Sequence, residues 1–169
     1  MHWTDQIFDT LSSEFSDVPD AAQITRILVR LLLAGVLGAV LGYDREQQGK
    51  AAGVRTHMLV AMGAALFVLV PQQAGMAIAD VSRVMQGVIA GIGFLGAGAI
   101  LRAQAEENVR GLTTAASVWM TAAIGIACGL GRESTAVLST LLALGVLSLV
   151  PHLTEGLRKK NPPPENRPR

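Results

Sequence analysis

Five stretches of this chain are apolar for about 20 residues each, which is the length that a helix needs to cross a bilayer. Charged residues gather in the short segments between these stretches, which cover residues 24–42, 57–74, 84–101, 112–130 and 134–151. A soluble bundle of 169 residues built from five such helices would lack the polar surface needed to cover it. The sequence therefore predicts an all-α membrane protein, a bundle of about five transmembrane helices.

The composition is also that of a membrane protein, and it argues against some classes of function. Only 16% of the residues are charged, against about 25% in a typical soluble domain, and the mean hydropathy is +0.41. The net charge of +1 and the lack of a basic patch with interleaved aromatics argue against nucleic acid as a partner. The single cysteine, Cys128, lies inside an apolar stretch and predicts a small packing residue. No cofactor is expected, and the metal ligands, if any, stay unknown.

The chain divides into three regions. Residues 1–23 form an acidic segment without the basic start of a cleavable signal peptide, and their apolar side chains predict a short interfacial helix on the outer surface. Residues 24–151 form the five-helix transmembrane domain. Residues 152–169 form a basic, proline-rich cytoplasmic tail, which is expected to be disordered.

Lys and Arg predict the orientation. With the N-terminus outside and five spans, ten of these residues fall in the inside segments and three in the outside segments. Cytoplasmic segments of membrane proteins carry an excess of Lys and Arg. We therefore predict that the N-terminus lies outside and the C-terminus inside.

Glycines predict how the helices pack, because helices in lipid associate through small residues that let their backbones approach. Pairs spaced by four residues occur on the first, third and fourth stretches, and the third stretch carries the most glycines. A helix this slim is expected at the bundle centre or at an interface between protomers. The predicted packing glycines are Gly38, Gly42, Gly87, Gly91, Gly93, Gly96, Gly98, Gly125 and Gly129.

One run of these glycines, residues 91–96, also matches the dinucleotide-binding pattern GxGxxG. That pattern works at a turn from a strand into a helix, where the helix N-terminus meets a pyrophosphate. Here it lies in the middle of an apolar stretch, so dinucleotide binding is rejected. Helix packing is the favoured interpretation, and a local break that exposes carbonyls to a cavity is the alternative.

Polar residues near the predicted cytoplasmic face form the candidate functional site. The segment after the first stretch and the segment before the fourth would meet there if their helices are neighbours. The alternatives are an ordinary solvated loop and hydroxyls bonded to their own helix. The predicted cluster contains Asp44, Arg45, Glu46, Arg55, Thr56, Asn108, Arg110, Thr113 and Thr114. The outer face has no comparable cluster in the sequence, and its Arg30 either extends toward water or pairs with Asp80 or Glu133.

Four segments together resemble the MgtC/SapB family of bacterial inner-membrane proteins. They are Asp44-Arg45-Glu46, Gly53-Val54-Arg55-Thr56, residues 91–98 and residues 109–116, and the resemblance covers residues 24–151. It implies a multi-pass protein of the inner (plasma) membrane linked to magnesium limitation, virulence or acid survival. One branch of the family is linked to inhibition of the F-type ATP synthase. Members tied to virulence often carry a soluble C-terminal domain, for which the 18 residues of region 152–169 are too short. The first carboxylate of the charged motif is commonly Glu, and here it is Asp44.

Three classes of function compete on this sequence. An enzyme is not expected, because no nucleophile–base pair and no metal-ligand spacing stand out. A small regulatory or interaction protein in magnesium or acid-stress homeostasis is the preferred hypothesis, with the bilayer, a second copy and another membrane protein as partners. The alternative is an oligomeric channel or transporter for Mg²⁺ or another cation. No Asp or Glu lies in the middle of a stretch, so such a path would rely on carbonyls or threonine hydroxyls.

Overall fold

The computed structural model describes residues 3–14, 16, 20–104 and 111–160 of the chain. The described residues form six helices and no strand. Five of these helices, α2 to α6, are long and apolar enough to cross a membrane, which confirms the predicted all-α membrane fold. The helices are α1 (Trp3–Glu14), α2 (Ala21–Gln47), α3 (Val54–Gln73), α4 (Ile78–Gln104), α5 (Gly111–Gly129) and α6 (Glu133–Lys160).

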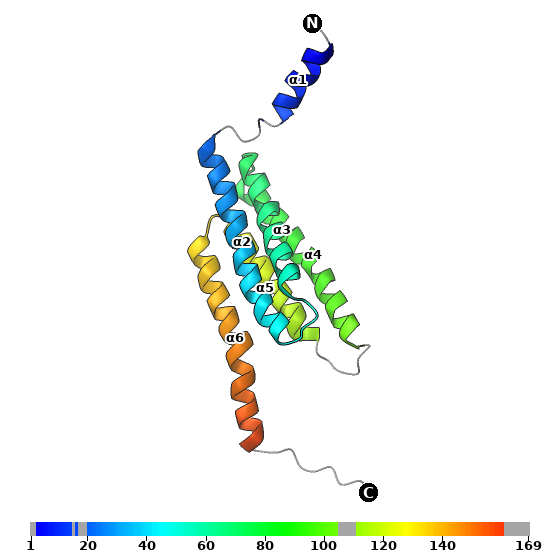
Figure 1. The fold of residues 1–169 in the computed structure, drawn as a ribbon, viewed down its shortest axis with the longest axis vertical. Helices are drawn as coiled ribbons and strands as arrows, with labels where there is room; N and C mark the ends of the chain where they lie inside the picture. The colour runs from blue at the N-terminus through cyan, green and yellow to red at the C-terminus, as the bar shows by residue number, and fades with distance from the viewer. Residues whose placement is uncertain (1–2, 15, 17–19, 105–110, 161–169) are drawn as a thin grey trace.

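Helix α5 is the centre of the bundle. It packs against α2, α3, α4 and α6. Half of the residues in its most apolar stretch are buried, whereas the corresponding share is 11% in α4 and in α6. Helices α4 and α6 make no contact with each other and lie on opposite flanks of the α2–α3–α5 core (Figure 1). The bundle therefore has a three-helix core and two flanking helices.

Glycines on α2 and α5 bring the core helices into backbone contact with α3. A Cβ added at Gly38 would lie 2.6 Å from the carbonyl oxygen of His57, and one at Gly129 would lie 2.5 Å from that of Ala65. At Gly125 the added Cβ would overlap the carbonyl oxygen of Ala61. Only glycine permits such approach between two helices. The glycine pairs on α2 and α5 therefore lie at close contacts with α3.

The prediction that the glycine-rich third stretch, α4, lies at the bundle centre is wrong. Added Cβ atoms at Gly87, Gly91, Gly93 and Gly98 would meet nothing within 4 Å, and Gly96 alone reaches a neighbour, the Cβ of Ala115 at 3.5 Å. The reason is that α4 packs on α5 through larger side chains, with Ile92 among them, and leaves the other four glycines exposed. The interface between protomers, the other half of that prediction, stays a prediction.

The ends of the chain also differ in part from expectation. Helix α1 lies within the region 1–23, buries no residue and contacts no other described helix, so its position on the membrane surface remains a prediction. The prediction of disorder is wrong for residues 152–160, which continue α6. This segment is rich in Leu, Glu, Lys and Arg, which favour a helix, and its prolines start only at Pro162. Residues 161–169 lie outside the described part of the chain.

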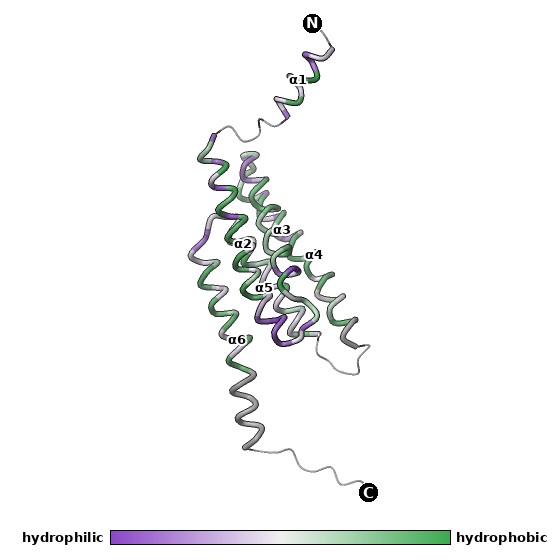
Figure 2. Tube along the Cα trace, in the orientation of Figure 1, coloured by the Kyte–Doolittle hydropathy of each residue, from purple (hydrophilic) through white to green (hydrophobic). Residues whose placement is uncertain are grey.

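Hydrophilic residues gather toward the two ends of the core, as Figure 2 shows. One end holds the connection from α2 to α3 and is called here the Asp44 end. The other end holds the start of α2 and the start of α6 and is called the Arg30 end. The five spans place these two ends on opposite sides of the bilayer.

Candidate functional site

Asp44 and Arg45 fasten the end of α2 to α6. The Arg45 side chain is 1% exposed, and its guanidinium pairs with the Asp44 carboxylate, the Nε donating to Oδ2 at 2.9 Å. The Nη2 of Arg45 also donates to the carbonyl oxygen of Leu147 at 3.2 Å. Ser148 and Gln48 donate to Asp44 Oδ1 at 3.0 and 3.1 Å. A buried guanidinium is therefore neutralised by a carboxylate that is itself held from two helices.

Glu46 closes the connection between α2 and α3. Its Oε2 accepts a hydrogen bond from the backbone N–H of Val54, the first residue of α3, at 2.9 Å. A carboxylate at a helix N-terminus is stabilised by the helix dipole and by the unpaired N–H groups there. Gly53 makes room for it, because a Cβ at this position would overlap the carboxylate.

His57 links α3 to α5 in the bundle interior. The residue is fully buried, with Nδ1 2.9 Å from the carbonyl oxygen of Gly53 and Nε2 3.3 Å from the hydroxyl of Ser117. The hydroxyl of Ser117 in turn donates to the carbonyl oxygen of Thr114 at 2.8 Å. A serine beside a histidine is the geometry of a nucleophile and its base. Here both side chains are buried and their polar atoms are bonded to the protein, which indicates a structural link.

The structure brings together some of the predicted cluster and separates the rest. Asp44, Arg45 and Glu46 share the end of α2, and Thr114 is buried on α5. Arg55 and Thr56 instead line a groove between α3 and α4, and Thr113 is exposed. Among the described residues, no hydrogen bond or ion pair joins these three side chains to Asp44 or Arg45. Asn108 and Arg110 lie outside the described residues.

Sequence reasoning missed the partners from α6. Asp44 was expected to meet the segment before α5, and its partner in another helix is Ser148. The available signal was the hydroxyl of Ser148, which lies near the end of the last apolar stretch. Gln48 could also have been found, because it lies one helical turn after Asp44.

Comparison with known protein families gives a direct match to this bundle. The model of the MgtC family matches residues 31–155, which include Asp44, Arg45, His57 and Ser148. The chain belongs to the MgtC family. This confirms the resemblance drawn from the four sequence segments, and together with the five spans it makes the chain a multi-pass protein of the bacterial inner membrane.

Three curated relatives of the MgtC family are similar to this chain. Protein SrpB of Synechococcus elongatus is 48% identical over 70% of this chain and 71% of its own length. The protein named "Putative magnesium transporter YhiD" of Escherichia coli strain K12 is 39% identical over 79% of this chain and 65% of its own length. Protein MgtC of Salmonella typhimurium is 44% identical over 69% of this chain, and the match spans 49% of that relative. No solved structure matches the chain.

The Arg30 end carries a polar cluster that the sequence did not predict. Arg30 donates from Nη1 to the carbonyl oxygen of Gly129 at 2.9 Å and to the side-chain oxygen of Gln72 at 3.2 Å. Its Nε lies 3.9 Å from the carboxylate of Glu133. Of the two predicted partners, Glu133 is therefore the one used and Asp80 is not. The prediction that this face lacks a polar cluster is wrong, since its members come from helices that are distant in sequence.

The described residues at the two ends do not form the ligand set of a metal site. Among the described residues there is no group of three or more His, Cys, Asp or Glu side chains that could hold an ion. Mg²⁺ prefers carboxylate oxygens and water, and the Asp44 carboxylate is already occupied by Arg45. The chemistry that this cluster supports is the fixing of two helices by a buried ion pair.

Proposed function

We propose that this member of the MgtC family is a small regulatory protein of the inner membrane. It acts in magnesium or acid-stress homeostasis by docking on other membrane proteins. Family membership, and relatives whose printed names are MgtC and "Putative magnesium transporter YhiD", support a magnesium-related membrane protein. The proposal includes no catalytic reaction. Following the charge bias of the sequence, the Asp44 end lies in the cytoplasm.

The observation that carries the proposal is the close packing of the core. Backbone carbonyl oxygens of α3 lie against Gly38, Gly125 and Gly129 without room for even a methyl group. Mg²⁺ gives up its waters reluctantly and needs space for several of them. A path through the α2–α3–α5 core would require these helices to separate, so the core supports a scaffold for docking better than a conduit.

The face offered for docking is the groove between α3 and α4. It has a volume of about 860 Å³ and an apolar lining, with Gly63, Gly87 and Gly91 among its walls. None of these three glycines has a neighbour within 4 Å of an added Cβ. Grooves with small residues are the surfaces that membrane helices use to approach each other. A transmembrane helix of a partner protein fits this surface.

Filling the groove is expected to abolish function without unfolding the protein. The double variant Gly87→Leu with Gly91→Leu adds bulk where the described structure is empty, so its melting temperature should stay within about 3 °C of the original. It should lose the ability to support growth of a deletion strain at low magnesium, with at least a tenfold fall in colony count.

The matched control for these variants is Gly145→Leu on α6, another glycine whose added Cβ meets nothing. It should support growth as the original chain does. Normal growth with the filled groove would contradict docking at this face. Equal loss with Gly145→Leu would show that any added bulk on the bundle is harmful.

The alternative function is an oligomeric channel or transporter for Mg²⁺ or another cation, with the path between protomers. The printed name of YhiD and the open glycine face of α4 favour it. Purified chain in liposomes that enclose an Mg²⁺-sensitive dye should show uptake no faster than empty liposomes, while an added ionophore gives the full signal. Uptake that rises with the amount of protein would overturn the regulatory proposal.

A further inference from the structure

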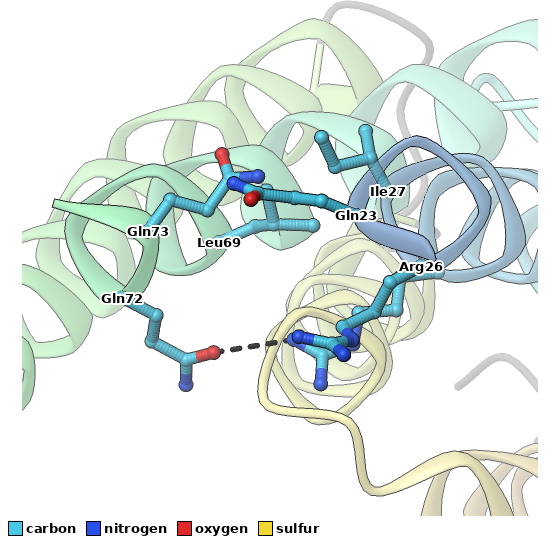
Figure 3. A pocket seen from close by; sticks show the side chains of 7 residues that line it. Gln23, Arg26, Ile27, Leu69, Gln72 and Gln73 are labelled. Carbon is cyan, nitrogen blue, oxygen red and sulfur yellow. Dashed lines mark hydrogen bonds between the residues drawn. The ribbon is translucent and has the colours of Figure 1, made fainter. Parts of the chain in front are cut away.

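A polar pocket of about 310 Å³ lies between α2 and α3 at the Arg30 end, away from the groove between α3 and α4. Its walls carry two guanidiniums and three amides above an apolar base that includes Leu69. Figure 3 shows Gln72 and Gln73 extending from α3 toward the part of α2 that carries Gln23 and Arg26. The polar lining residues are Gln23, Arg26, Arg30, Gln72 and Gln73.

The pocket has an excess of positive charge. Arg26 and Arg30 are one turn apart on the same face of α2. The described structure gives Arg30 a single carboxylate, Glu133, at 3.9 Å, and gives the Arg26 side chain no ion pair or hydrogen bond. Among the described residues, two cations therefore face one anion, which favours a negatively charged ligand.

One donor of the Arg30 guanidinium is buried without an acceptor. The Nε of Arg30 is shielded from solvent and has no hydrogen-bond partner, since Glu133 lies beyond hydrogen-bonding distance. Buried polar groups in proteins are nearly always bonded, so the Arg30 guanidinium is not fully satisfied by its partners in the protein. The amide groups of Gln23 and Gln73 add neutral donors on the other side of the pocket.

We propose that this pocket binds a phosphate group through Arg26 and Arg30. Guanidiniums pair with phosphate oxygens by two parallel hydrogen bonds, and a phosphate has enough oxygens to bond both arginines and an amide at once. Arg26 lies about 8 Å along α2 from its start, which places it close to the depth of lipid headgroups. The phosphate can therefore belong to an anionic lipid headgroup or to a soluble phosphate compound.

Arg26→Gln is the decisive variant, because Arg26 has no bond in the described structure whose loss would unfold the protein. Inorganic phosphate at about ten times its dissociation constant should raise the melting temperature of the purified chain by about 3–5 °C over chloride at equal ionic strength. The variant should lose this shift. Arg83→Gln should keep it, because Arg83 is exposed at the same end and its ion pair in the described structure is with Asp80.

A second arm identifies the source of the phosphate. Native mass spectrometry of the chain after exchange into phosphatidylglycerol or phosphatidylcholine should show retained phosphatidylglycerol, lost in Arg26→Gln and kept in Arg83→Gln. A thermal shift without lipid retention assigns a soluble phosphate, and retention without a shift assigns a headgroup. Neither response, or equal responses in Arg26→Gln and the original chain, would overturn the proposal.

Discussion

Replacing Asp44 by alanine is expected to lower the free energy of unfolding by about 3–5 kcal/mol. The side chain of Arg45 is 1% exposed, and Asp44 is the carboxylate that neutralises it. Without this partner, the guanidinium keeps only the carbonyl oxygen of Leu147 and remains as an uncompensated charge inside the bundle. Reversible unfolding in mixed detergent micelles measures the loss directly.

A double-mutant cycle separates this ion pair from simple loss of contacts. The variant with Asp44→Ala and Arg45→Met should be less destabilised than the sum of the two single variants, because it no longer buries a lone charge. Gln48→Ala, which removes an exposed partner of the same carboxylate, should cost no more than about 1 kcal/mol. Additive effects of Asp44→Ala and Arg45→Met would mean that the two charges act separately.

The second large effect is expected from the smallest possible substitution at Gly125. A methyl group there would overlap the carbonyl oxygen of Ala61, which belongs to the backbone of α3 and cannot rotate away. Helices α3 and α5 would have to move apart, so Gly125→Ala should destabilise the chain by about 3 kcal/mol or more. Lower yield in the membrane and a lower melting temperature in detergent are the measurable results.

The matched control, Gly93→Ala on α4, should stabilise the chain instead of destabilising it. An added methyl meets nothing there, and alanine in a helix interior is favoured over glycine by about 0.5–1 kcal/mol. A neutral result at Gly125 would show that the contact between α3 and α5 is looser than the structure has it. Destabilisation at Gly93 would instead indicate that a second protomer covers this face of α4.

The fold could be predicted because the bilayer sets the length of each apolar stretch. All five predicted stretches are helices, and several helices are longer than predicted: α4 begins at Ile78, α6 continues to Lys160, and α2 continues through the polar residues 43–47. Hydropathy places the end of a span where polar residues begin, whereas a helix continues as long as its backbone is bonded. The charged residues Asp44 and Arg45 therefore lie on the helix itself.

The candidate site could be predicted only for residues close together in the chain. Asp44, Arg45 and Glu46 were found because charges at the end of an apolar stretch are easily seen, but Ser148 was not, since hydropathy does not say which helices are neighbours. Glycine spacing has the same limit. Gly87 and Gly125 each begin a pair of the same spacing, yet only Gly125 faces another backbone.

Helix α6 is attached to α2 at both faces of the membrane. Glu133 meets Arg30 at one face and Ser148 meets Asp44 at the other, two points separated by about 21 Å along α2. A helix of this length is stiff, so α6 cannot turn about its axis at one attachment without straining the other. Any change that draws Arg30 away from Glu133 at one end of α2 is therefore expected to shift α6 beside Asp44 at the other end.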